Sequence, residues 1–411
     1  MQRRSPDEHS ASQLVVLVCI AQALVQLGAF FWPDLLPRMI ALWGLSYSEA
    51  GWITAAFYGA YILAVPFLVT LTDRLDQKLV YLSAVALTVV GHLLFGLVAD
   101  GFWSAMAARA LTGAGWAGTY MTGLKLLADR VDAKLLSRAT AGHAASIGIS
   151  GALSFVCAEL VADLAGWKAA FFGASATAAL AWVIIFVAVP RTSAAPPLPR
   201  GALFDFRPVL RNRSAMAYAI VYGIHTLEMS ALRGWGVAFL GFVAASTGAT
   251  ASLVSPATAL TILGLAGTVA SILGNEAAIR LGRRRLIVLA LLASTACAGL
   301  LGLLGSASYA LAAALLLLYG PIIWLDSSSL TAGTAGTAEP SRRGATLAVH
   351  SMLGYIGGFI GPLAVGWILD LGGGMAPTTW AAAFLAVALL SVVALAVFTL
   401  MRPQELSGDR G

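Results

Sequence analysis

Long apolar runs recur along almost the whole chain, and they constrain its fold more than any other feature. A run of about 20 residues with few charges has the length that crosses the hydrocarbon core of a bilayer as a helix. About twelve such runs are bounded by charged residues or by Pro and Gly. We expect spans at 14–38, 49–71, 79–99, 102–127, 138–164, 168–189, 214–243, 250–273, 286–305, 308–333, 344–369 and 379–401. Helices are expected because a lipid-facing strand edge would leave backbone groups unpaired.

The composition excludes a soluble globular protein. Of the 411 residues, 59% are hydrophobic and 11% are charged, whereas soluble domains have about 45–50% apolar and about 25% charged residues. A soluble chain with so little charge would expose large apolar patches and aggregate. We therefore predict an all-α, multi-pass membrane protein with about 12 transmembrane helices and the lipid bilayer as its surroundings.

The Lys and Arg residues indicate the orientation, because cytoplasmic loops carry an excess of them. With both termini cytoplasmic, only Arg38 and Lys168 lie on the opposite side, and only Arg109, Lys125 and Arg233 lie within spans. We therefore predict cytoplasmic termini and a location in the cytoplasmic (inner) membrane. The formal net charge of +6 then reflects topology, and nucleic acid is not an expected partner.

A Pro- and Arg-rich stretch near the middle divides the chain. We interpret residues 190–213 as a cytoplasmic linker between an N-terminal six-helix bundle, residues 1–189, and a C-terminal six-helix bundle, residues 214–411. Two short internal matches, at offsets near 206–213 residues, support pseudo-symmetric halves: Trp167 to Phe171 with Trp380 to Phe384, and Asp73-Arg74-Leu75 with Ile279-Arg280-Leu281.

These features resemble the major facilitator superfamily over essentially the whole chain. The segments that carry the resemblance are Asp73-Arg74 between spans two and three, Arg280-Leu-Gly282-Arg283-Arg284 between spans eight and nine, Arg109-x-x-x-Gly113-x-Gly115 in span four, and Gly357 through Gly361-Pro362 in span eleven. The chain departs from the family pattern at Asp76, Gln77 and Lys78, which replace a Gly and most of a basic run. The fifth span also lacks the Gly-Pro pair that drug antiporters of the family usually carry.

The resemblance implies two bundles that rock about a central site, with spans one, four, seven and ten lining the cavity. It also implies a charge relay that closes the cytoplasmic gate, to which Asp73, Arg74 and Arg280 would belong. The alternative for these three residues is simple anchoring of loops on the cytoplasmic side.

The seventh span carries the densest set of polar groups. Tyr222, His225, Met229 and Arg233 share one helical stripe, and Glu228 lies beside it. Ionisable residues within spans are costly and usually functional. We predict that Glu228 carries a coupled proton, with a static Glu–Arg or Glu–His pair as the alternative. His225 and Met229, one turn apart, also allow a soft-metal site, such as one for copper, although Met more often fills packing gaps.

Three further spans supply the remaining candidates. In span four, Arg109, Trp116 and Tyr120 share a face and can clamp an anion against an aromatic wall; an Arg paired with an acidic neighbour as a gate fits equally. In span ten, Asp326 is the second candidate for proton coupling. In span one, Gln22, Gln26 and Asp34 recur at intervals that bring them roughly to one side of the helix. They can hydrogen-bond either a polar substrate or a neighbouring helix.

Together these features predict a proton-coupled secondary transporter that moves a small polar, anionic organic solute by alternating access. Its partners are the solute, protons and lipid. The substrate-binding residues are then Gln22, Gln26, Asp34, Arg109, Trp116, Tyr120, Tyr222, His225 and Arg233, with Glu228 and Asp326 for proton coupling. The alternatives are a proton-antiport efflux pump for drugs or metabolites, a soft-metal transporter using His225 and Met229, and a transporter-like sensor without flux. Zinc-protease, serine-hydrolase and P-loop motifs do not occur, so we expect no enzyme activity, no cofactor and no resident metal.

Overall fold

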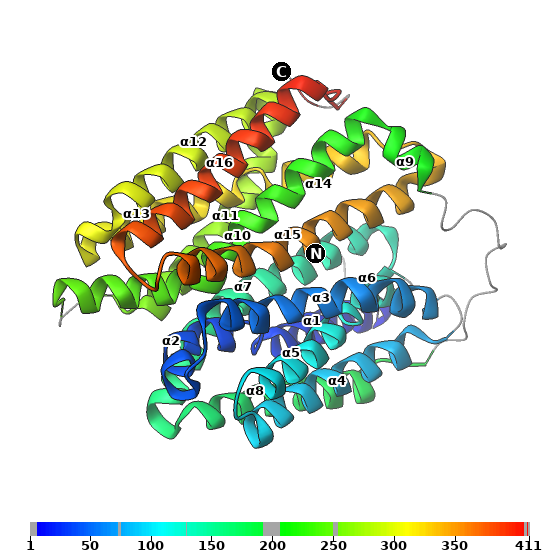
Figure 1. The fold of residues 1–411 in the computed structure, drawn as a ribbon. Helices are drawn as coiled ribbons and strands as arrows, with labels where there is room; N and C mark the ends of the chain where they lie inside the picture. The colour runs from blue at the N-terminus through cyan, green and yellow to red at the C-terminus, as the bar shows by residue number, and fades with distance from the viewer. Residues whose placement is uncertain are drawn as a thin grey trace. The chain divides into compact units, whose positions relative to one another are not determined.

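The computed structural model describes residues 6–72, 75–128, 130–191, 206–249, 254–406 and 409, and most of these residues are in helices, as predicted. The α-helices are α1 (Pro6–Gln26), α2 (Phe31–Trp43), α3 (Tyr47–Leu71), α4 (Gln77–Val98), α5 (Phe102–Ala117), α6 (Tyr120–Ala128), α7 (Ala133–Ala165), α8 (Trp167–Ala188), α9 (Arg207–Arg211), α10 (Arg213–Thr247), α11 (Pro256–Leu281), α12 (Arg283–Leu304), α13 (Tyr309–Trp324), α14 (Ser327–Gly336), α15 (Arg343–Leu371) and α16 (Pro377–Met401). Short 3-10 turns precede α13 and α15. Figure 1 shows the labelled helices in order along the chain.

Among the described residues, 11 helical stretches are long and apolar enough to cross a membrane. The remaining predicted span, residues 102–127, is divided into α5 and α6. At the break, the N–H groups of Gly118 and Thr119 donate to carbonyls three residues earlier, each at 3.1 Å. Such bonds tighten the chain into a 3-10 turn and interrupt the α-helical ladder. The all-α, multi-pass fold is therefore confirmed, with a break in the fourth span that the apolar pattern does not reveal.

Local capping explains one predicted span whose bounds were wrong. The eighth span was expected at 250–273, but α11 runs Pro256–Leu281. Ser255 caps this helix by accepting the Thr258 N–H, and Pro256 occupies its first turn. Proline at the first helical position needs no hydrogen-bonded N–H, so a Ser-Pro pair is a helix-start signal that outweighs the apolar run before it.

The chain forms two compact units. The first unit comprises residues 1–35 and 56–199, and the second comprises residues 36–55 and 200–411. In the first unit, α4 packs against α5 and α8. Its core includes Tyr81, which is fully buried among apolar side chains of α1, α4, α6 and α8.

The second unit is built around α10, which packs against α13, α14, α15 and α16. Figure 1 shows α10 and α15 side by side along most of their length. This close approach depends on glycine, because a Cβ atom at Gly357 or Gly361 of α15 would collide with a backbone carbonyl of α10. Small residues of this kind let membrane helices pack with their backbones in contact.

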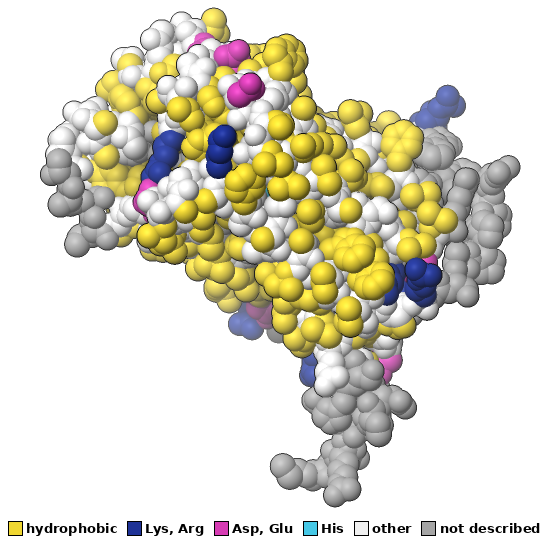
Figure 2. Space-filling view, turned by 90° about the horizontal axis from the view of Figure 1, so that it is seen from below, with side chains coloured by type: hydrophobic (Ala, Val, Ile, Leu, Met, Phe, Trp, Pro, Cys, Tyr) yellow, Lys and Arg dark blue, Asp and Glu magenta, His cyan; other side chains and the backbone are white. Residues whose placement is uncertain are grey.

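Large apolar side chains cover the outside of the helices. Leu63, Phe67 and Leu371 are 72%, 77% and 89% exposed. On the face drawn in Figure 2, hydrophobic side chains dominate and charged side chains occur only singly or in small groups. A surface of this composition suits lipid and would be unfavourable in water.

Candidate functional site

The polar groups of the first unit centre on Arg109, which α5 holds in its interior. Its side chain is buried (2% exposed for the residue), and its guanidinium carbon lies 4.5 Å from the centroid of the Phe57 ring on α3. Within the described part of the chain, neither Nε nor Nη1 of Arg109 has a hydrogen-bond partner. A buried guanidinium with donors to spare is costly unless something binds to it, which makes Arg109 a candidate anion receptor.

A small cavity in the same unit has room for about one water molecule. It is lined by Val25, Gln26, Ala29, Phe57, Thr88, His92, Thr112, Trp116 and Thr119. Phe57 stacks on Trp116 with centroids 4.9 Å apart, so one aromatic wall serves both Arg109 and the cavity. Oε1 of Gln26 and Nδ1 of His92 also lack hydrogen-bond partners in the described ranges.

The other candidate residues of the first unit, Gln22, Asp34 and Tyr120, lie in different surroundings. Gln22 accepts a hydrogen bond from the Tyr81 hydroxyl at 3.1 Å, a helix-to-helix contact. Asp34 is buried on α2, beyond a break between Gln26 and Phe31 that splits the predicted stripe of span one. Tyr120 stacks on His143 of α7 with centroids 5.8 Å apart, because the α5–α6 break turns it away from the register of Trp116.

In the second unit, Glu228 lies in a cage of hydroxyl groups. Ser294 of α12, Tyr319 of α13 and Ser391 of α16 all donate to its carboxylate, the last at 3.2 Å. Glu228 is 3% exposed, and each hydrogen bond of its carboxylate in the described part of the chain comes from a hydroxyl group. Four helices therefore converge on one acidic side chain, beside a small cavity that Trp235 and Trp380 also line.

His225, one turn before Glu228 on α10, is paired with Asp326 instead. Nδ1 of His225 lies 3.1 Å from Oδ1 of Asp326, and both side chains are almost fully buried. This distance fits an ion pair. Asp326 lies between the end of α13 and the start of α14, where the helix is interrupted.

The other candidates of α10 contact aromatic rings. Tyr222 stacks on His350 of α15 with centroids 3.9 Å apart. His350 in turn contacts the hydroxyls of Thr331 and Thr334 at 3.1 and 3.0 Å. The guanidinium carbon of Arg233 lies 4.8 Å from the centroid of the Trp324 ring, a cation–π contact.

Of the predicted gate residues, Asp73 and Arg74 lie outside the described residues. Arg280 pairs with Glu276 one turn earlier on α11, at 2.7 Å, and both side chains are more than half exposed. The described residues contain no group of three or more His, Cys, Asp or Glu side chains that could hold a metal ion. The partner of His225 in an ion pair is Asp326.

Several residues of these sites were missed at the sequence level. His92 carried a usable signal, because it is one of only five His residues and falls within an apolar span. Ser294, Tyr319 and Ser391 carried none, because single hydroxyl residues in apolar helices usually satisfy their own backbone or a neighbour. Only the fold brings them to Glu228.

Comparisons with known proteins agree with this architecture. The model of the Major Facilitator Superfamily matches residues 18–320. An uncharacterized MFS-type transporter of Bacillus subtilis (strain 168), YbcL, is 25% identical over 235 residues; the match covers 54% of this chain and 59% of that protein. The chain thus spans little more than half the length of this relative.

Solved structures show the same fold over nearly the whole chain. A bacterial homolog of the human lysosomal transporter Spinster, in an inward-facing and occupied conformation, superposes with a TM-score of 0.79 at 15% identity, covering 97% of this chain and 98% of that one. A point mutant of the nucleoside transporter NupG superposes with a TM-score of 0.77 at 15% identity, covering 94% of this chain and 99% of that one. At these identities the likeness shows the fold alone. With the family match over most of its length, this chain belongs to the major facilitator superfamily.

Proposed function

We propose that this protein is a proton-coupled secondary transporter that carries a small polar, anionic organic solute across the cytoplasmic membrane by alternating access, with both termini in the cytoplasm. The superfamily and the transporter fold supply the general class. Proton coupling rests on polar groups of the second unit, and the anionic substrate rests on polar groups of the first unit.

Proton coupling rests on the hydroxyl cage of Glu228. A hydroxyl can donate to a carboxylate and can accept from a carboxylic acid. The three hydroxyls around Glu228 can therefore satisfy it in either protonation state by rotating, without a change of partner. A fixed cation would instead hold the group ionised. Asp326, beside His225, is the second proton carrier of the proposal.

The anionic substrate rests on Arg109. Arg is the side chain best suited to bind carboxylate or phosphate, and two donors of Arg109, Nε and Nη1, are left without a partner in the described ranges. The Phe57–Trp116 wall and Gln26 would contact the remainder of the solute. Tyr120, Tyr222, Arg233, Gln22 and Asp34 remain proposed contacts of the transport pathway.

The test is flux into proteoliposomes under an imposed pH gradient. The solute panel contains mono- and dicarboxylates and nucleosides, the last because one structural neighbour is a nucleoside transporter. Gradient-driven accumulation that is lost in Glu228→Gln, with counterflow exchange retained, supports proton coupling at Glu228. If Glu228→Gln still accumulates solute and Asp326→Asn does not, Asp326 is the carrier. Saturable binding without flux of any solute would favour a sensor.

A further inference from the structure

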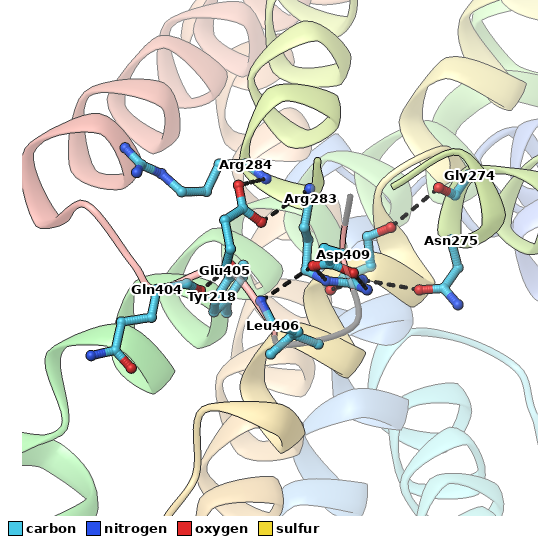
Figure 3. A network of polar contacts seen from close by, with 10 residues as sticks. Tyr218, Gly274, Asn275, Arg283, Arg284, Gln404, Glu405, Leu406 and Asp409 are labelled. Carbon is cyan, nitrogen blue, oxygen red and sulfur yellow. Dashed lines mark hydrogen bonds and ion pairs between the residues drawn. The ribbon is translucent and has the colours of Figure 1, made fainter. Parts of the chain in front are cut away.

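The start of α12 carries an acid-binding site that the chain fills with its own C-terminal segment. Arg283, the first residue of α12, is 2% exposed and donates from Nε and Nη2 to the two carboxylate oxygens of Asp409, at 3.0 and 2.9 Å. Its Nη1 donates to Oδ1 of Asn275 and to the Ser329 carbonyl. Figure 3 shows this guanidinium between Asp409 and Asn275, with dashed lines marking the contacts.

A second carboxylate of the same segment caps the helix itself. Glu405 accepts the backbone N–H groups of Arg283 and Arg284, at 3.1 and 3.0 Å. These are the first two amides of α12, which have no partner within the helix. The residue that precedes them, Gly282, has no side chain to cap them. Glu405 therefore performs the task of an N-cap from more than a hundred positions away.

The first unit performs this task locally. α4 and α12 are equivalent under the internal repeat, because their first residues, Gln77 and Arg283, and their last residues, Val98 and Leu304, each differ by 206 positions. In α4 the N-cap is Asp76, which accepts the Lys78 N–H at 3.0 Å. Asp76 also pairs with Arg130 at 3.5 Å. One loop acid thus serves both a helix start and a buried arginine.

The second copy of the loop cannot supply that acid from the equivalent position. Gly282 corresponds to Asp76 and has φ +90°, a conformation in which other residues are strained, whereas Asp76 has φ −57°. A carboxylate side chain at position 282 would therefore require a different loop. Glu405 takes over the capping role and Asp409 takes over the pairing role.

We propose that Glu405 and Asp409, which follow α16, are the resident ligands of this site and supply the acid that position 282 lacks. The segment is anchored elsewhere as well: the Gln404 carbonyl accepts from the Tyr218 hydroxyl at 2.9 Å, and the Gln404 N–H donates to Ser214 at 3.1 Å. The Arg283 and Asp409 side chains are each 2% exposed. A pair so deeply buried is a permanent part of the second unit, because its separation would leave two charges without partners.

The test measures amide hydrogen exchange at the start of α12 in the full-length protein. Glu405→Ala and a chain ending at Arg402 are expected to speed exchange of the Arg283 and Arg284 amides by roughly ten- to a hundred-fold, since each loses a charged acceptor. Asp409→Asn is expected to lower the thermal midpoint of the second unit. The matched control is Glu276→Ala, which removes an exposed carboxylate of the neighbouring helix and is expected to change neither quantity.

Adding the missing segment as a separate peptide distinguishes loss of a specific binding site from general destabilisation of the shortened chain. A synthetic peptide of residues 403–411, added to the shortened chain, is expected to restore slow exchange with saturation, and the same peptide with Asp409→Asn is not. Exchange that stays within twofold of wild type in both Glu405→Ala and the shortened chain would overturn the proposal. Equal rescue by both peptides would overturn the role of Asp409. Neither readout requires transport, so failure of the proposed function leaves this test intact.

Discussion

The carboxylate of Asp370, near the end of α15, caps the start of α3 by accepting the backbone N–H groups of Tyr47 and Ser48 at 2.9 and 2.7 Å. The Ser48 hydroxyl also donates to it. Ser46 and Glu49 form a capping box at the same helix start, since each accepts the backbone N–H of the other. The first turn of α3 is therefore fixed both by its own sequence and by a residue more than three hundred positions away.

Replacing Asp370 by Ala is expected to destabilise the protein by about 1–3 kcal/mol, because two helix-start amides and one hydroxyl lose a charged acceptor. The measurement is the free energy of unfolding in mixed micelles. The control is Asp132→Asn at the exposed start of α7, where Asn caps as well as Asp. Equal stability of Asp370→Ala and wild type would contradict the capping role.

The α10–α15 contact predicts opposite effects for two glycines. Gly357→Ala is expected to cost about 1–3 kcal/mol, because the added Cβ would collide with the Gly223 carbonyl and neither backbone can yield cheaply. Gly299→Ala in α12, where a Cβ would meet no atom within 4 Å, is expected to stabilise by about 0.5–1 kcal/mol through helix propensity. The measurement is thermal unfolding of both variants under the same conditions. A similar loss of stability in both variants would disprove the close contact between α10 and α15.

The fold followed from the sequence because apolar runs of span length have one solution in a bilayer. The partners of single polar residues did not follow. Ser294, Tyr319 and Ser391 lie 66, 91 and 163 positions from Glu228, and no spacing rule links residues so far apart. The sequence offered Glu228 a static pair with His225 or Arg233, yet His225 pairs with Asp326 while Glu228 takes hydroxyl partners.

Helix ends could be predicted from the sequence only where the capping residue is close to the helix in the sequence. The Ser-Pro start of α11 and the Ser46–Glu49 box are visible in the sequence, because capping acts within four residues. Caps supplied from a distance, by Asp370 at α3 and Glu405 at α12, leave no local trace. The α5–α6 break after Ala117 falls in a glycine-rich run that suits helix packing equally well, so its position could not be fixed beforehand.

The His225–Asp326 pair predicts strong energetic coupling between the two side chains. A double-mutant cycle of His225→Gln and Asp326→Asn is expected to give an interaction free energy of about 1–3 kcal/mol, because each single change leaves a buried polar partner unmatched. The same cycle on the exposed Arg280–Glu276 pair is expected to give about 0.5 kcal/mol or less. The measurement is unfolding free energy in mixed micelles, and additive effects at His225 and Asp326 would rule the pair out.

We expect replacement of Arg109 to affect the stability of the protein and its transport activity in different ways. A buried guanidinium whose Nε and Nη1 lack partners in the described part of the chain destabilises the fold, so Arg109→Met is expected to raise the thermal midpoint or leave it unchanged. The same variant is expected to abolish saturable transport of the anionic solute, and Arg109→Lys to raise its KM by roughly ten-fold or more, because Lys lacks the planar, five-donor guanidinium. Lys78→Met is the contrasting control: its ammonium donates to the Phe186 and Val189 carbonyls at 2.7 and 2.6 Å, so its loss is expected to lower the midpoint. If Arg109→Met lowers the midpoint as much as Lys78→Met does, Arg109 is a structural residue and the anionic class of the solute loses its main support.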